Sequence, residues 1–568
     1  MCGTFFVPYS YLRFMLDNYA IADQFSLLSK LMDIHQENSF KSKSYASAAF
    51  SIEKLPVQLS TVPKTELATL KGIGASTANK IIEILETGKL SALEELISKT
   101  PPGILEMMQI KGLGPKKIST IWKEMGIESI GELLYACNEN RLLLFKGFGE
   151  KTQKNVSDAI SFYLKHQGHY LYAEIEEYAN HLMNTLKSEF KNNNWAFVGP
   201  FSRQVPTIEQ LSLITDTPST LVEQFMLDNE FQIIKTTGLT TVFKGKEEVS
   251  IEINSSESKD YITASFKLTG SNAFIDKWTA LFPLSLESSS SEEEIFNKAG
   301  VKHIPSFLRE DPNIIEISKS IELNDIISTK EIKGIIHTHS DWSDGINTVE
   351  EMAKACKDDG FEYLVISDHS KSAFYANGLT EERIKAQHQY IEELNQKYAP
   401  FKIFKSIECD ILNDGSLDYS DAMLSTFDLV IASVHSNLKM NEEKAMQRLI
   451  KAIENPYTRI LGHPTGRLLL SREGYPVDHD KLIDACIANK VVIEINAHPR
   501  RLDLDWKWIM KAQDKGALFS INPDAHSIEG YKDIRYGVLA SQKGLLKASS
   551  NLSSFSLSAF EAFLTTYK

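Results

Sequence analysis

Six imidazole and three carboxylate side chains in the C-terminal part of the chain stand at or near the ends of short apolar runs. His337 and His339 alternate in GIIHTH, and Asp344 follows in the next turn. The other six candidates are His369, Glu408, His435, His463, Asp524 and His526. Imidazole and carboxylate together suit zinc, manganese or iron, and leave coordination positions open for water. The pattern therefore predicts a hydrolytic metal centre.

A structural role is the simpler interpretation of any single histidine in this set. Nine of the 14 histidines lie beyond residue 330, where about six are expected from length alone, so enrichment is mild. Position is more informative, because six of the nine end a strand-like run. The other three are interpreted as structural, since they lie on helical or loop segments: His388, His479 and His498.

The elements that must position these ligands are strands alternating with helices. After Ile335 seven short apolar runs alternate with amphipathic segments, which predicts a parallel sheet or barrel. The carboxyl ends of such strands meet at one mouth, where the ligands would gather. Upstream, residues 20 to 185 have helical periodicity, and from Trp195 alternating β-branched runs predict an antiparallel sheet.

Seven short motifs around these ligands indicate a resemblance to a known family. HTHSDWSDG, ISDHS, IECD, SVHS, GHPTGRLLL, EINAHPRRLDLDW and PDAHS resemble the successive motifs of the PHP (polymerase and histidinol phosphatase) domain, in its bacterial family X DNA polymerase version. The resemblance implies three divalent cations, manganese or zinc, with iron as a further option. It assigns His337, His339, Glu408 and Asp524 to one, Glu408, His435 and His463 to a second, and Asp344, His369 and His526 to the third.

Three clustered cations supply what phosphate ester hydrolysis requires. They lower the pKa of a bridging water, hold phosphate oxygens and neutralise the leaving oxyanion. Arg467 and Arg501 lie beside ligand-bearing segments and could clamp the non-bridging oxygens. Packing against Asp503 or Asp505 is an equally good interpretation of both arginines, and the sequence leaves the choice open.

Three copies of a KGxG motif precede helical segments in the first 160 residues. KGIG, KGLG and KGFG start at residues 71, 111 and 146. One such motif often only marks a helix end, but three with basic neighbours fit helix-hairpin-helix DNA binding, in which glycines let the backbone approach a phosphate. The predicted DNA contacts here are Gly72, Gly74, Lys111, Gly112, Gly114, Lys116, Lys146, Gly147 and Gly149.

The segment around the first motif resembles the lyase-type eight-kilodalton domain of family X polymerases. By that resemblance Lys80 falls at the Schiff-base position and Lys41 at a 5′-phosphate ligand. A Schiff-base lysine must be deprotonated to attack a sugar aldehyde. The alternative is that Lys80 is merely a solvated helix lysine and that the domain only holds DNA.

The polymerase palm of the family has no intact metal triad here. In GPFSRQVPTIEQLSLI the family's glycine remains, but Gln210 and Ser212 stand where two aspartates are expected, and Ser250 stands at the third. Without those carboxylates two magnesium ions would not be held. Glu209 and Glu252 are expected to point to the opposite strand face, so neither is a predicted substitute.

The predicted organisation has four parts after a possible mis-started extension at 1–14. These are all-α helix-hairpin-helix domains at 15–100 (lyase-like) and 101–185 (fingers-like), a degenerate α+β palm and thumb at 186–325, and a PHP domain at 330–568 with a distorted (β/α)7 barrel. Five scattered cysteines without a CxxC pair indicate a reducing, cytoplasmic compartment, and no apolar run is long enough for a membrane span.

These features predict a DNA-repair hydrolase acting on gapped, nicked or 3′-end duplex as a monomer. The resemblance implies 3′–5′ exonuclease activity, with 3′-phosphatase or abasic-site cleavage as options. The alternatives are a gap-filling polymerase whose PHP domain proofreads, a small-molecule phosphatase of the histidinol-phosphate type, and a non-catalytic DNA-end scaffold. The net charge of −14 does not separate them.

Overall fold

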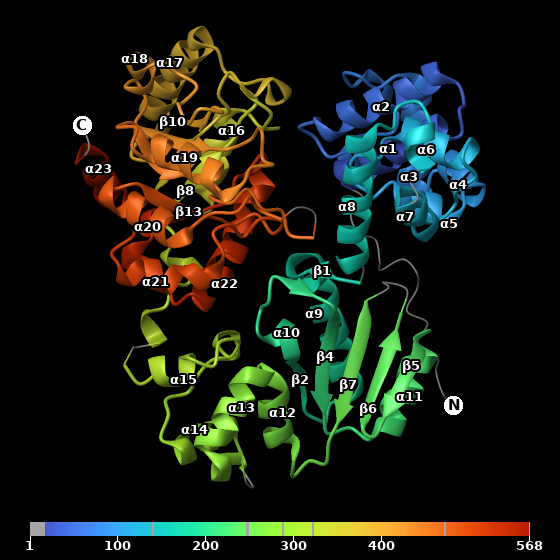
Figure 1. The fold of residues 1–568 in the computed structure, drawn as a ribbon, viewed down its shortest axis with the longest axis vertical. Helices are drawn as coiled ribbons and strands as arrows, with labels where there is room; N and C mark the ends of the chain where they lie inside the picture. The colour runs from blue at the N-terminus through green and yellow to red at the C-terminus, as the bar shows by residue number, and fades with distance from the viewer. Residues whose placement is uncertain are drawn as a thin grey trace. The chain divides into compact units, whose positions relative to one another are not determined.

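A computed structural model describes residues 17–138, 141–166, 168–245, 249–286, 289–320, 323–470 and 473–566 (Figure 1). The predicted extension at 1–14 lies outside the described residues. The chain forms two compact units, Met1–Gln167 and Gly168–Lys568. None of the described helices is long and apolar enough to cross a membrane.

The N-terminal unit is entirely helical, as predicted. Its helices are α1 (Asn18–Ile34), α2 (Ser39–Glu53), α3 (Ala75–Thr87), α4 (Ser91–Ser98), α5 (Pro102–Met107), α6 (Pro115–Lys123), α7 (Ile130–Asn138) and α8 (Glu150–His166). Phe25, Ile81 and Ile121 are fully buried in one shared core. That core fixes the loops between the helices, which carry the three KGxG motifs.

The second unit begins with a five-stranded sheet of order β2-β4-β7-β6-β5. Its strands are β2 (Trp195–Val198), β4 (Gln210–Thr215), β5 (Gln232–Thr237), β6 (Thr240–Lys244) and β7 (Ser250–Ser255). The prediction of an antiparallel sheet holds for every neighbouring pair except β4 and β7, which are parallel. Helices α9 (Tyr172–Glu189) and α11 (Ser219–Asp228) cover one face of this sheet.

The position of α9 corrects one predicted boundary. Ile175, Leu182 and Met183 of this helix pack in the same core as Leu211 and Ile251 of the sheet. The first unit therefore ends at 167, and the boundary expected at 185 falls inside a helix of the palm-like part. Beyond the sheet, α12 (Tyr261–Thr269), α13 (Asn272–Leu281) and α14 (Glu292–Ala299) pack around the buried Trp278.

The C-terminal part contains the predicted seven-stranded parallel sheet. Its strands follow chain order: β8 (Gly334–Thr338), β9 (Tyr363–Ile366), β10 (Lys402–Asp410), β11 (Leu429–Ser433), β12 (Thr458–Leu461), β13 (Val492–Asn496) and β14 (Phe519–Asn522). The first and last strands meet, because the His339 amide donates to the Ala525 carbonyl over 2.8 Å. The sheet is thus a nearly closed barrel, as the PHP resemblance implied.

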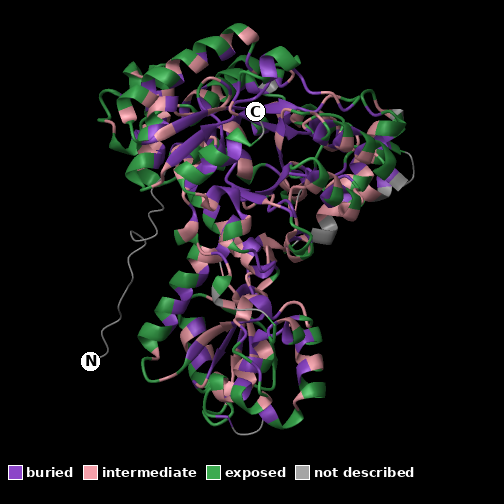
Figure 2. Ribbon diagram, turned by 90° about the vertical axis from the view of Figure 1, so that its left-hand side faces the viewer, coloured by how far each residue is buried: buried purple, intermediate pink, exposed green. Residues whose placement is uncertain are grey.

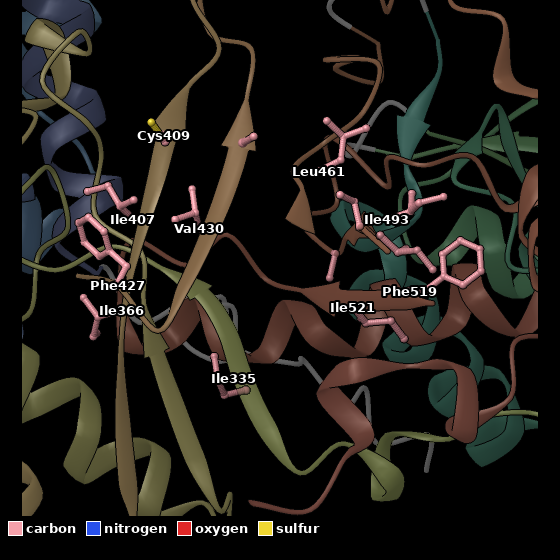
Figure 3. Close-up of a cluster of buried hydrophobic side chains, with 14 of the residues drawn as sticks. Ile335, Ile366, Ile407, Cys409, Phe427, Val430, Leu461, Ile493, Phe519 and Ile521 are labelled. Atoms are coloured by element: carbon pink, nitrogen blue, oxygen red, sulfur yellow. The ribbon is translucent and has the colours of Figure 1, made fainter. Parts of the chain in front are cut away.

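Both faces of the barrel sheet are packed against other elements, and this packing holds the strand ends that carry the predicted ligands. One face packs against helices that include α16 (Val349–Asp358), α17 (Glu381–Tyr398), α19 (Glu442–Ile453), α20 (His479–Ala488) and α22 (Ile534–Lys543). Figure 3 shows part of this cluster, including Ile366, Ile407 and Val430. The other face forms a second cluster with α23 (Leu557–Thr565). The strands are buried while the outer helix faces are exposed (Figure 2).

Candidate active site

All nine predicted metal ligands lie together at the carboxyl ends of the barrel strands. The ligand atoms of eight of them form three groups, each with mutual separations within 4.8 Å, and the ninth, His463, lies 2.9 Å from Glu408. The groups are His339 with Asp344, His369 and His526; His337 with His339 and Asp524; and His369 with Glu408 and His435. The grouping differs in detail from the expected one, because His339 and His369 each belong to two groups.

Glu408 occupies the centre of the cluster. Its Oε1 lies 3.3 Å from His337 Nε2, 3.1 Å from His435 Nε2 and 2.9 Å from His463 Nε2. Its Oε2 lies 3.0 Å from His369 Nδ1 and 3.6 Å from His339 Nε2. Burial would raise the pKa of this carboxyl, but the surrounding imidazoles, led by His435, hold it well below its usual range. A charged carboxylate within 3.6 Å of five imidazoles would serve as a metal ligand at the centre of the cluster.

Several buried ligand atoms of the cluster make no hydrogen bond of acceptable geometry among the described residues, although some lie close to one another. They are Nε2 of His337, Nδ1 of His339, Nδ1 of His463 and Oε2 of Glu408. A buried polar atom without a partner costs free energy, so native proteins rarely leave several in one place. Divalent cations would satisfy these atoms, and the nitrogen and oxygen donor set suits them. The residues present therefore fit a metal centre.

Three of the nine residues hold an unusual backbone conformation. His337, His463 and Asp524 have φ of 65°, 23° and 54°. Positive φ is unfavourable for residues other than glycine and tends to cluster at functional sites, where the surrounding fold imposes it. The conformation at His337 also breaks the simple strand alternation on which the sequence prediction relied. The packed barrel thus aims these side chains at the cost of local strain.

Two buried carboxylates that were not predicted orient the ligands from behind. Glu494 Oε1 lies 2.5 Å from His337 Nδ1, and its Oε2 accepts from the His463 amide over 2.6 Å. Asp410 Oδ1 lies 2.5 Å from His435 Nδ1. Such partners fix the imidazole tautomer and ring direction. Asp410 is the last residue of β10, so its position was an available signal, whereas Glu494 lies in the middle of β13.

The two arginines left open by the sequence have different surroundings. Arg467 Nη1 donates to Asp505 Oδ2 over 2.6 Å, and its Nε donates to the Arg501 carbonyl over 2.9 Å. This arginine is therefore held in a structural ion pair, and its predicted role as a phosphate clamp is not supported. Arg501 instead reaches the cluster, with Nε 3.5 Å from Asp524 Oδ2.

The helix-hairpin-helix motifs have the predicted backbone geometry. Gly72, Gly112 and Gly147 have φ of 83°, 90° and 97°, a region that favours glycine. Gly74 and Gly114 are the N-caps of α3 and α6, so the next helix presents free amides to an anion. Gly149 precedes α8 at the matching position. Lys111, Lys116 and Lys146 are exposed beside these turns, and Lys41 is exposed in the first turn of α2.

Lys80 does not have the surroundings of an activated nucleophile. It is half-buried on α3, with its Nζ 5.8 Å from the centre of the Tyr45 ring. An aromatic face favours a charged ammonium, whereas Schiff-base chemistry needs the neutral amine. The geometry gives the lyase interpretation no added support, and it stays a prediction.

A lysine substitution tests the predicted DNA contact at α6. We expect Lys116→Gln to lower the slope of log affinity against log salt by about 0.9 for duplex DNA, because one phosphate contact and its released counterion are lost. The measurement is fluorescence anisotropy over a salt series. Lys123→Gln, at the other end of the same helix, is the matched control and should leave the slope unchanged; an equal change in both variants would contradict the assignment.

The palm-like sheet brings the three lost carboxylate positions together. Gln210 of β4 pairs in register with Ser250 of β7, and Gln210 Nε2 donates to Ser212 Oγ over 3.4 Å. The prediction for Glu252 was wrong: it pairs with Ser212 and lies two residues after Ser250, so it shares their sheet face. The three positions themselves still carry one amide and two hydroxyls, which are neutral.

Comparison with known proteins divides the chain in the same order as the structure. Residues 16–90 match the helix-hairpin-helix domain family, and residues 104–160 match the SAM-like helix-hairpin-helix tandem family. Residues 336–498 match the PHP domain family. The PHP match begins in β8 and ends just after β13, and thus includes seven of the nine clustered ligands.

Curated relatives fall into two groups by coverage. The DNA polymerase/3′–5′ exonuclease PolX of Bacillus subtilis is 34% identical over 562 residues, which is 94% of this chain and 96% of that protein. A probable phosphatase of Thermoanaerobacter sp. is 27% identical over 201 residues, 34% of this chain and 77% of that protein. A probable phosphatase of Caldanaerobacter subterraneus is 28% identical over 205 residues, with 34% and 74% covered.

The phosphatases match one part of the chain, whereas PolX matches nearly all of it. The longer match covers the barrel with its nine clustered imidazoles and carboxylates, and it also covers the helix-hairpin-helix unit. The chain therefore belongs to the PolX family, the bacterial family X DNA polymerases with a C-terminal PHP domain, and is an enzyme of the metal-dependent phosphoesterase and exonuclease type.

Proposed function

We propose that this enzyme removes nucleotides from DNA 3′ ends by metal-dependent hydrolysis and does not extend primers. The observation that carries the proposal is the buried Glu408 carboxylate in contact with five imidazoles at one end of the barrel. We assign the nine clustered residues to three divalent cations, manganese or zinc, with iron as a further option.

The chain's own residues have distinct tasks in this reaction. Bound cations would activate a water and neutralise charge on the phosphate. Glu408 would be a central ligand of the bound cations, while Glu494 and Asp410 fix the orientation of the His337 and His435 rings. Arg501, close to Asp524, is placed to donate to a non-bridging phosphate oxygen. The Arg467 side chain holds the Arg501 backbone by donating a hydrogen bond to the Arg501 carbonyl.

The helix-hairpin-helix unit favours DNA over a small molecule as the substrate. Three glycine turns with exposed lysines suit a phosphate backbone without reading its sequence. A small-molecule phosphatase needs no such unit, although the probable phosphatases resemble the barrel alone. We therefore propose gapped, nicked or 3′-end duplex as the substrate, with 3′-phosphate or abasic-site removal as related reactions of the same centre.

The second candidate is a gap-filling polymerase that uses the barrel for proofreading. It is favoured by the name of the Bacillus subtilis relative, which includes DNA polymerase. The neutral side chains of Gln210, Ser212 and Ser250 oppose it, because magnesium is held by carboxylates. The proposed activity is therefore assigned to the metal cluster of the barrel and not to the palm-like sheet.

Digestion of a gapped duplex labelled at the 3′ end of the upstream strand tests the proposal. Protein stripped of metal by a chelator should leave the strand intact, and reconstitution with manganese or zinc should restore stepwise shortening. Digestion that proceeds equally well in stripped protein would overturn the metal-dependent mechanism. Cleavage of a small phosphate monoester without any DNA shortening would favour the small-molecule alternative.

The unpredicted carboxylate Glu494 gives a second test of the centre. We expect Glu494→Gln to weaken metal affinity by about 10- to 100-fold, because His337 loses its charged partner. The measurement is competition for zinc against a chromogenic chelator. Glu443→Gln, an exposed substitution at the start of α19, is the control and should bind as the natural protein does. Equal affinity in both variants would show that Glu494 does not support the ligands.

A further inference from the structure

We propose that Phe374 is a stacking platform for a nucleobase of the strand whose 3′ end enters the metal cluster. This inference rests on the proposed function. It names a residue that holds the substrate strand beside the centre, which the nine metal ligands do not determine.

The Phe374 ring is held out into solvent by a well-anchored loop. Its exposed fraction is 88%, whereas the neighbouring Ala373 and Ala376 are 0% and 1% exposed. The Ser372 amide and hydroxyl both donate to Asp418, over 2.7 and 2.6 Å. The Lys371 amide donates to the Tyr419 hydroxyl over 3.0 Å. Fixed backbone on both sides means that the ring's exposure is built into the fold.

The same loop is tied to the metal cluster at both of its ends. It leaves from His369, whose carbonyl accepts from the Leu379 amide over 2.9 Å and so closes the loop. The Asn377 side chain donates to the Trp342 and Ser343 carbonyls, next to Asp344. Phe374 is five positions after His369, so their Cα atoms are at most about 18 Å apart. The ring therefore lies within reach of a strand whose phosphate occupies the cluster.

A nucleobase is the ligand that this arrangement suits. A lone exposed aromatic ring is too small to be a protein-docking patch, but it offers one face of the size of a base. Exposed Lys371, three residues away, adds positive charge for the adjoining backbone. Aromatic rings combined with basic side chains are how proteins hold single strands without reading sequence.

Two oligonucleotides that differ only in their bases test the inference. One single strand carries ordinary nucleotides at its 3′ end, and the other carries abasic tetrahydrofuran residues in the last three positions. With manganese-loaded full-length protein, we expect Phe374→Ala to lower kcat/KM on the first strand by roughly 5- to 150-fold. The variant should act on the abasic strand as the natural protein does, and Phe374→Trp should retain activity on the first.

Controls separate stacking from damage to the centre. Metal content should be equal in all proteins, and Leu284→Ala, which alters another exposed apolar side chain, should leave both substrates unaffected. Equal loss on both strands, or no loss on the first, would overturn the stacking role while leaving the hydrolase intact. If the natural protein shortened the gapped duplex but neither single strand, the stacking role would be overturned alone; if it shortened no DNA at all, the proposed function would fail, and this inference with it.

Discussion

Replacing Glu408 by glutamine is expected to lower DNA hydrolysis by at least about 1,000-fold, because one neutral amide cannot bridge cations among five imidazoles. The substitution keeps the size of the side chain and removes its charge. The loss should appear in kcat on the 3′-labelled gapped duplex, with DNA affinity unchanged, since the helix-hairpin-helix unit is untouched.

The same variant should also lose bound metal, which separates a chemical effect from a binding effect. Metal content is measured by mass spectrometry on the purified protein, and DNA affinity by anisotropy. Glu443→Gln again serves as the control, because that carboxylate is exposed at the start of α19. Full hydrolysis by Glu408→Gln with its metals retained would contradict the central position given to this carboxylate.

The second prediction with a large expected effect concerns primer extension, and we expect the protein to extend no primer. Gln210, Ser212 and Ser250 replace three carboxylates, and losing about 5 kcal/mol of charge stabilisation corresponds to a rate lower by roughly 10³- to 10⁴-fold. The assay supplies magnesium, a gapped duplex and each of the four nucleotides. It should use Asp344→Ala protein, so that nuclease activity cannot erase an extended primer.

A variant in which the three carboxylates are restored is the matched comparison for the primer-extension assay. Gln210→Asp, Ser212→Asp and Ser250→Asp together return carboxylates to three positions that share one sheet face, and we expect them to raise magnesium affinity at this sheet. Extension by the Asp344→Ala protein without those changes would favour the polymerase alternative, with Glu252 as the first carboxylate to examine because it lies on that face.

The metal cluster was predictable because its ligands obey a simple rule of position. The carboxyl ends of parallel strands lie at one edge of the barrel. The nine ligands between residues 337 and 526 could therefore be assigned to one site from spacing and resemblance alone. Glu494 and Asp410 were missed because each acts through a ring contributed by a different strand. The His337 and Glu494 pair, for instance, joins residues 157 positions apart. No local pattern marks such a contact.

The sequence left the partner of Arg467 open, because a phosphate and Asp505 are chemically equivalent choices and only packing decides between them. Two predictions were wrong for specific reasons. The error at Glu252 came from the strand period, since residues two apart return to the same face. The amphipathic helix α9 was assigned to the helical unit, because its apolar stripe can pack on a helix or on a sheet.

The most direct test of the central claim is to locate and count the metal ions in the full-length protein. Crystals grown with manganese should show three anomalous scattering peaks among the nine clustered side chains, with Glu408 touching two of them. A cluster that stays empty under those conditions, in protein that still shortens DNA, would contradict the account.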